Sequence, residues 1–144
     1  MIEKMKALVR EKDSCVLATV SSGKPHCSLM SYIADPECRE IFMVTHSKTR
    51  KYKNLQENPC VSLLIDTREE GRGIAIGQKK ALTVSGIFQK VDSARKKVIR
   101  AQFLDRHPQL KELVDDPEAV LISVRVQSFQ LLEGVRDAYF AEPD

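Results

Sequence analysis

The residues best suited to do chemistry are four cations within six positions of one another, namely Lys48, Arg50, Lys51 and Lys53. Residues 49 to 57 read as a short helix, so Arg50 and Lys51 fall in its first turn. A helix N-terminus offers unpaired N–H groups and partial positive charge, which suit phosphate. Cations there cost a few tenths of a kcal/mol unless an anion neutralises them. The pattern indicates either an anion site or a solvated basic helix face.

The charge pattern argues against a nucleic-acid partner. The basic cluster is short, Tyr52 is its only aromatic residue, and Glu57 and Asp66 follow closely. A phosphate track needs a longer basic surface than this, and a net charge of +3 over 144 residues is mild. The sequence contains no P-loop, G-x-S-x-G or G-x-G-x-x-G motif, so no catalytic residue is assigned from a motif.

Cysteines and histidines form no recognisable metal pattern. The four cysteines form no C-x-x-C pair, and a site built from His26, Cys27 and His46 matches no structural zinc spacing, so we expect no metal. The N-terminal stretch is amphipathic and charged, without the apolar core of a secretory signal, and no apolar run is long enough to span a membrane. We therefore expect a cytoplasmic protein with reduced thiols and no membrane partner.

The elements that must position the cationic cluster are mostly strands. Six segments alternate or are rich in β-branched residues, and they predict strands at 14–21, 26–35, 41–45, 60–67, 81–91 and 119–134. The short connections between most of them make these strands antiparallel. Helices are predicted at 2–12, 49–57, near 93–105 and briefly at 110–114, and 68–80 reads as a loop or irregular hairpin. Gly86 predicts a bulge or a close approach to the backbone.

No linker, repeat or low-complexity tract divides the chain, so we expect one domain over residues 1–144. Strands of this number and length are expected to curl or close, because closure removes exposed edges. The expected fold is mainly β with peripheral helices, a small barrel with a sandwich as the alternative. Helices that cover only part of the sheet leave apolar faces exposed, which predicts a dimer.

Residues 41–66, IFMVTHSKTRKYKNLQENPCVSLLID, resemble the flavin-binding segment of the pyridoxamine 5′-phosphate oxidase-like proteins, the FMN-binding split barrels. The matching elements are Thr45, Thr49-Arg50-Lys51, Asn54-Leu55 and Asn58-Pro59-Cys60-Val61-Ser62-Leu63. The order of elements also agrees from about residue 3 to residue 134. The resemblance implies an antiparallel six-stranded split β-barrel and a homodimer with FMN at the subunit interface.

The resemblance also implies roles for individual residues. Arg50 and Lys51 match the family pair that binds the FMN phosphate. The other candidate cofactor-binding positions, at two strands and at the start of the helix, are Ser28, Leu29, Met30, Val44, Thr45 and Thr49. Two positions depart from the family enzyme, with Ser28 in place of an arginine and Ala81 in place of a glutamine.

The C-terminal part of the chain departs further from the oxidase that gives the family its name. It has no tryptophan and no Arg-x-His to grip pyridoxamine phosphate, so another small-molecule substrate is expected. The resemblance favours an FMN-dependent oxidoreductase acting on an unidentified substrate. The alternatives are a flavin-binding sensor or storage module without turnover, and the same fold holding heme or a deazaflavin.

Overall fold

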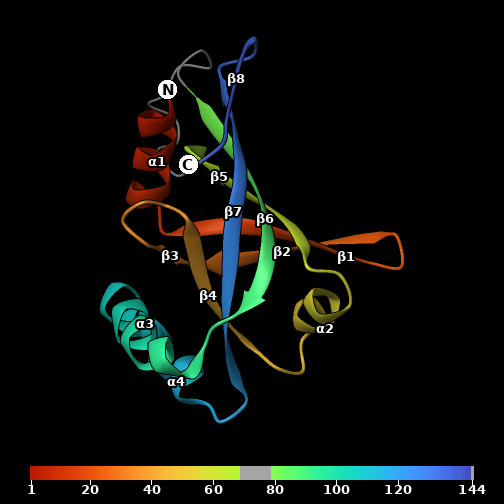
Figure 1. Cartoon of the computed structure of the whole chain (residues 1–144), viewed down its shortest axis with the longest axis vertical. Helices are drawn as coiled ribbons and strands as arrows, with labels where there is room; N and C mark the ends of the chain where they lie inside the picture. The colour runs from red at the N-terminus through yellow and green to blue at the C-terminus, as the bar shows by residue number, and fades with distance from the viewer. Residues whose placement is uncertain (69–78, 144) are drawn as a thin grey trace.

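A computed structural model of the chain describes residues 1–68 and 79–143. Within these residues, helices surround a single antiparallel sheet (Figure 1). The strands are β1 (Ser14–Ser21), β2 (Lys24–Ser31), β3 (Ile33–Ala34), β4 (Glu40–His46), β5 (Cys60–Asp66), β6 (Lys80–Lys90), β7 (Ala119–Glu133) and β8 (Asp137–Ala141). The helices are α1 (Ile2–Glu11), α2 (Arg50–Glu57), α3 (Ser93–Arg106) and α4 (Lys111–Asp115), with a 3-10 turn at Pro108–Leu110.

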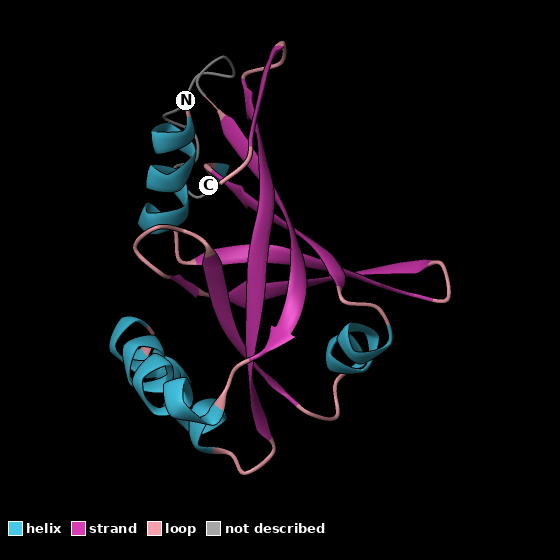
Figure 2. Ribbon diagram, viewed as in Figure 1, coloured by secondary structure: helices cyan, strands magenta, loops and turns pink. Residues whose placement is uncertain are grey.

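The sheet follows the spatial order β2-β1-β5-β6-β7-β4-β3, with β8 added beside β7. Figure 2 shows the β1–β2 hairpin crossing the long strands β6 and β7, so the sheet curls strongly. The curl brings β2 near β4, close to the two ends of the strand order. The concave side is filled by apolar side chains that alternate along the strands, among them Leu17, Met43, Leu63, Leu82 and Phe129.

The expected fold class, a mainly antiparallel β half-barrel with peripheral helices, is confirmed. The expected count of six strands is corrected to eight among the described residues. Tyr32 divides the expected second strand into β2 and β3, because its N–H donates to the Asp13 carbonyl at 3.0 Å and its hydroxyl to the Val9 carbonyl at 2.6 Å. Strand β8 lies where the sequence predicted no element, and most of the loop expected at 68–80 lies outside the described residues.

The helices lie at the rim of the sheet, α1 at the upper left of Figure 1, α3 and α4 at the lower left and α2 at the lower right. Buried Met5, Leu8 and Val9 dock α1 on the core. The imidazole of buried His107, just after α3, lies 2.8 Å from the Tyr32 carbonyl. No helix in the described part of the chain is long and apolar enough to cross a bilayer.

Gly86 lies at a bulge between β6 and β7. The pairing shifts from Ser85 opposite Ser128 to Gly86 opposite Val126, which leaves Gln127 as the extra residue of β7. A Cβ atom at Gly86 would lie 2.5 Å from Val124 Cγ1 and 2.7 Å from the Arg125 carbonyl oxygen. The bulge and the close approach predicted at this glycine are therefore both present.

We expect Gly86→Ala to lower the free energy of unfolding by about 1–3 kcal/mol, because a methyl group there forces β6 and β7 apart. Chemical denaturation followed by circular dichroism measures the change. Ser85→Ala, a substitution at the half-buried neighbour, is the control and should change stability far less. Equal stability of Gly86→Ala and the unmodified protein would show that the strands accommodate a side chain at this position.

Candidate anion-binding site

The cationic cluster follows β4 and starts α2, and a set of hydrogen bonds fixes this turn. The Thr49 hydroxyl donates to the His46 carbonyl at 2.9 Å and accepts from the Tyr52 N–H at 3.3 Å. Thr49 is thus the N-cap, and Arg50 and Lys51 are the first two helical residues, as predicted. Their N–H groups stand at positions that have no acceptor inside a helix, so they are available to an anion.

Helix α2 is held against β1 by contacts at its middle and at its C-terminal end. The Asn54 side-chain amide donates to the Thr19 hydroxyl at 3.1 Å, and both residues are buried. The neighbouring Leu55 is also buried and belongs to the main core. Ser21 donates a further hydrogen bond to Glu57 at the end of the helix. These contacts orient α2 without using its N-terminal cations.

A groove of about 860 Å³ lies between the start of α2 and the β1–β2 hairpin. Its walls come from three segments of the chain and consist of Ser21, Ser22, Lys24, Pro25, His26, Ser47, Lys48, Thr49, Arg50, Lys53, Asn54 and Gln56. The hairpin turns tightly, with positive φ of 52° at Ser22 and 74° at Gly23. This turn brings Lys24 and His26 opposite the helix.

All the charged side chains that line the groove are cationic. Four cations and an imidazole line it, and none of its lining side chains is a carboxylate. Among the described residues, no ion pair involves Lys24, Lys48, Arg50 or Lys53, whereas cations elsewhere do pair, as Arg95 does with Glu40 and Arg100 with Asp115. Cations gathered in a concave site raise the local concentration of anions. The geometry and the donors therefore fit a phosphate.

The predicted site residues do not all line this groove. Thr49 and Arg50 do, while Lys51 is half-buried and is not one of the lining residues. The lining also includes Lys24 and His26, which the sequence reasoning missed as site residues. They belong to a hairpin more than twenty positions earlier in the chain, and only the docking of α2 on β1 brings them here. The turn signal at residues 22–25 predicted the hairpin, but it did not predict that α2 lies beside the hairpin.

The other predicted flavin contacts lie on β2 and β4. Met30 and Thr45 are buried, Ser28 is half-buried, and Leu29 is 78% exposed on the outer face of the sheet. The Thr45 hydroxyl lies 3.3 Å from that of Thr49, which links the end of β4 to the helix cap. Val44 lines a different cavity on the other side of α2. Flavin contact by these residues remains a prediction.

The described residues hold no metal centre and no disulfide. No three His, Cys, Asp or Glu side chains there gather in a way that could hold a metal ion. All four cysteines are free, and Cys15 and Cys38 are buried. Burial raises the pKa of the Cys15 thiol to about 12, so this thiol stays protonated and unreactive.

Comparison with known proteins gives a family match and shared folds. A family model described as pyridoxamine 5′-phosphate oxidase matches residues 1–133. General stress protein 26 of Bacillus subtilis (strain 168) is 31% identical over 119 residues, which cover 82% of this chain and 78% of that protein.

Two solved structures share the fold at low sequence identity. A heme binding protein from Mycobacterium smegmatis has a TM-score of 0.85 at 18% identity, covering 98% of this chain and 57% of the other. A FAD-binding protein from Mesorhizobium loti has a TM-score of 0.74 at 14% identity, covering 91% and 93%.

We expect Thr49→Val to lower the free energy of unfolding by about 1 kcal/mol, since it removes the cap of α2 while keeping the shape of the side chain. Thermal or urea denaturation measures the loss. Thr49→Ser keeps the hydroxyl and should remain close to the unmodified protein. If Thr49→Val is as stable as the unmodified protein, the hydroxyl cap does not stabilise the helix.

Proposed function

Because this chain belongs to the pyridoxamine 5′-phosphate oxidase family of split barrels, we propose that it is an FMN-binding flavoprotein and an oxidoreductase acting on a small molecule. The observation that carries the proposal is the groove at the start of α2, where cations without ion-pair partners among the described residues surround a capped helix N-terminus. The same residues form the segment that resembles the family's flavin-binding motif.

The groove residues fit the phosphate of FMN. Arg50 offers a planar guanidinium that can bind two phosphate oxygens, while Lys48, Lys53 and Lys24 supply point charges around it. Thr49 keeps the helix start in place through its two hydrogen bonds. Lys51 contributes the second backbone N–H of the helix, and its side chain adds positive charge beside the groove.

The rest of the cofactor is proposed to follow β2 away from the groove. Alternate residues of a strand share a face, so His26, Ser28 and Met30 form one line that starts in the groove. Bound FMN would supply the electron-transfer chemistry. This chain's residues bind and orient it, and His26, the one imidazole among the residues lining the groove, is placed to hold or move a proton.

Heme is the second candidate cofactor. A solved structure that shares this fold is described as a heme binding protein, and the His26 imidazole lines the groove. The absorption spectrum of the purified protein separates the two cofactors, since oxidised flavin gives two bands in the near-ultraviolet and blue and heme gives a Soret band. A Soret band that is lost in His26→Ala would favour heme over FMN.

We also propose a homodimer formed through the outer face of the sheet. The pairing registers place Leu29, Val16 and Leu64 side by side across β2, β1 and β5. Leu29 is 78% exposed while Val16 and Leu64 are half-buried, and apolar side chains that reach the surface side by side commonly mark interfaces. Leu29 projects from the opposite face of β2 to Ser28 and Met30, so this interface would lie behind the proposed flavin path.

We expect Arg50→Ala combined with Lys51→Ala to weaken FMN binding by about a hundredfold, because the two charge-assisted contacts of the Arg50 guanidinium and the positive charge of Lys51 beside the groove are lost. Riboflavin, which lacks the phosphate, should bind almost unchanged. Flavin fluorescence titration measures both ligands, with Lys90→Ala combined with Lys96→Ala as a control for lost surface charge. Equal losses for FMN and riboflavin would mean that the double variant disturbs the fold instead of the phosphate contact.

Sedimentation equilibrium at micromolar concentration should give twice the 16.3 kDa mass of one chain. Leu29→Asp should shift the protein toward monomer, because it places a charge in the apolar row. Val98→Asp, at an exposed valine on α3, is the matched control and should remain dimeric. An unmodified protein that sediments as a monomer with FMN bound would rule out the proposed interface.

A further inference from the structure

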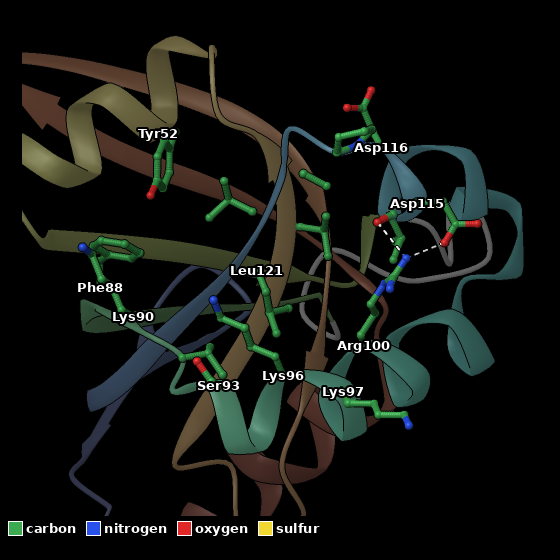
Figure 3. Close-up of a pocket in the computed structure, with 16 residues that line it drawn as sticks. Tyr52, Phe88, Lys90, Ser93, Lys96, Lys97, Arg100, Asp115, Asp116 and Leu121 are labelled. Atoms are coloured by element: carbon green, nitrogen blue, oxygen red, sulfur yellow. Dashed lines mark hydrogen bonds and ion pairs between the residues drawn. The ribbon is translucent and has the colours of Figure 1, made fainter.

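A second cavity of about 810 Å³ lies on the other side of α2, and it shares no lining residue with the anion-binding groove. Residues of α2, β4, β6, β7 and α3 line it, together with the segment before β7 (Figure 3). Its volume is in the range of sites that bind small organic molecules. The cavity is therefore a candidate binding site separate from the anion-binding groove.

One wall of this cavity is aromatic and its floor is apolar. The rings of Tyr52 and Phe88 meet edge to face, with centroids 6.4 Å apart and planes at 87°. Buried Val44 and Val91 and half-buried Leu121 lie beneath them. A flat aromatic ligand can place the face or the edge of its ring against this wall. Aromatic pairs in these geometries gain free energy beyond that of burying their surface.

The rim of the cavity is positively charged. Lys90, Lys96 and Lys97 line it, and none of them forms an ion pair with a carboxylate in the described part of the chain. Figure 3 shows the Lys96 side chain extending across the cavity toward Leu121, while that of Lys97 points away. Lys90 and Lys96 are thus the two cations most available to a ligand.

The two carboxylates of the lining do not cancel this charge. Asp115 accepts from Arg100 at 2.6 Å and also pairs with Lys111. Asp116 accepts from the backbone N–H of Glu118 at 2.8 Å. Arg100 is in turn engaged by Asp115 and by the Val114 carbonyl. The guanidinium fork that best matches a phosphate is therefore occupied, and point-charge ammonium groups remain.

We propose that this cavity binds a planar aromatic carboxylate. Its ring would lie against Tyr52 and Phe88 on the apolar floor, and its carboxylate would meet Lys90 and Lys96. The ammonium rim disfavours cations, and the aromatic wall gives no advantage to a small inorganic anion. This site stands independently of the proposed flavin, because the two cavities have no lining residue in common.

The test is calorimetric titration with 2-naphthoate and with the neutral 2-naphthalenemethanol. The acid should bind at least about tenfold more tightly than the alcohol, since only the acid forms charge-assisted contacts. Lys90→Ala combined with Lys96→Ala should remove that difference and leave the alcohol unchanged. Phe88→Leu should weaken both ligands. Arg50→Ala combined with Lys51→Ala should bind 2-naphthoate as the unmodified protein does.

Three results would overturn the proposal. The first is the absence of 2-naphthoate binding at millimolar concentration, and the second is equal affinity for acid and alcohol. The third is displacement of 2-naphthoate by riboflavin, which would assign the cavity to the flavin ring. A protein that binds no FMN but retains 2-naphthoate would contradict the proposed function and leave this site intact. Both lysines are exposed, so their substitution should not prevent folding.

Discussion

The close approach of β6 to β7 at Gly86 is the constraint on which the rest of the architecture depends. Strand β7 pairs with β6 along one edge, and with β4 and then β8 along the other. The change from β4 to β8 coincides with the bulge at Gln127, where the ladder shifts by one residue. A bulge bends a strand and increases its twist. The part of β7 before the bulge can therefore pair with β4, which leads into the turn that starts α2. The part after the bulge pairs with β8.

The cations of the groove are not used to hold that turn. Neutral contacts fix α2, namely the Asn54–Thr19 hydrogen bond, buried Leu55 and the Thr49 cap. Exposed ion pairs contribute little to stability in general, so pairing Lys48 or Arg50 with a carboxylate would have stabilised the fold only slightly. What distinguishes the groove is a concentration of positive charge, without ion-pair partners in the described part of the chain, on a helix start of fixed geometry. Such an arrangement favours the binding of an anionic ligand and adds little to the stability of the fold.

The sequence predicted best what depends on neighbours in the chain. Thr49 and Asn58-Pro59 set the ends of α2, and Asp92 and His107-Pro108 set those of α3, because caps and proline act locally. The structure differs from the sequence prediction where contacts between residues far apart in the chain determine the local structure. Tyr32 ends β2 because its N–H donates to Asp13, just after α1, and its hydroxyl to Val9 of α1. Strand β8 forms because β7 offers it a free edge. Contacts between distant parts of the chain also place Lys24 in the groove and Val44 in the second cavity.

Helix α2 gives the molecule two sites because its side chains point in different directions. Residues three apart lie roughly 60° from each other around a helix, and residues two apart lie about 160° from each other. Arg50 and Lys53 therefore share the side that faces the groove, while Tyr52 points to the aromatic cavity and Leu55 to the core. Both cavities thus use one two-turn helix that is anchored at Asn54 and Leu55. If a ligand in one cavity shifts α2, linkage requires that a ligand in the other respond by the same factor. If α2 stays rigid, the two affinities are independent.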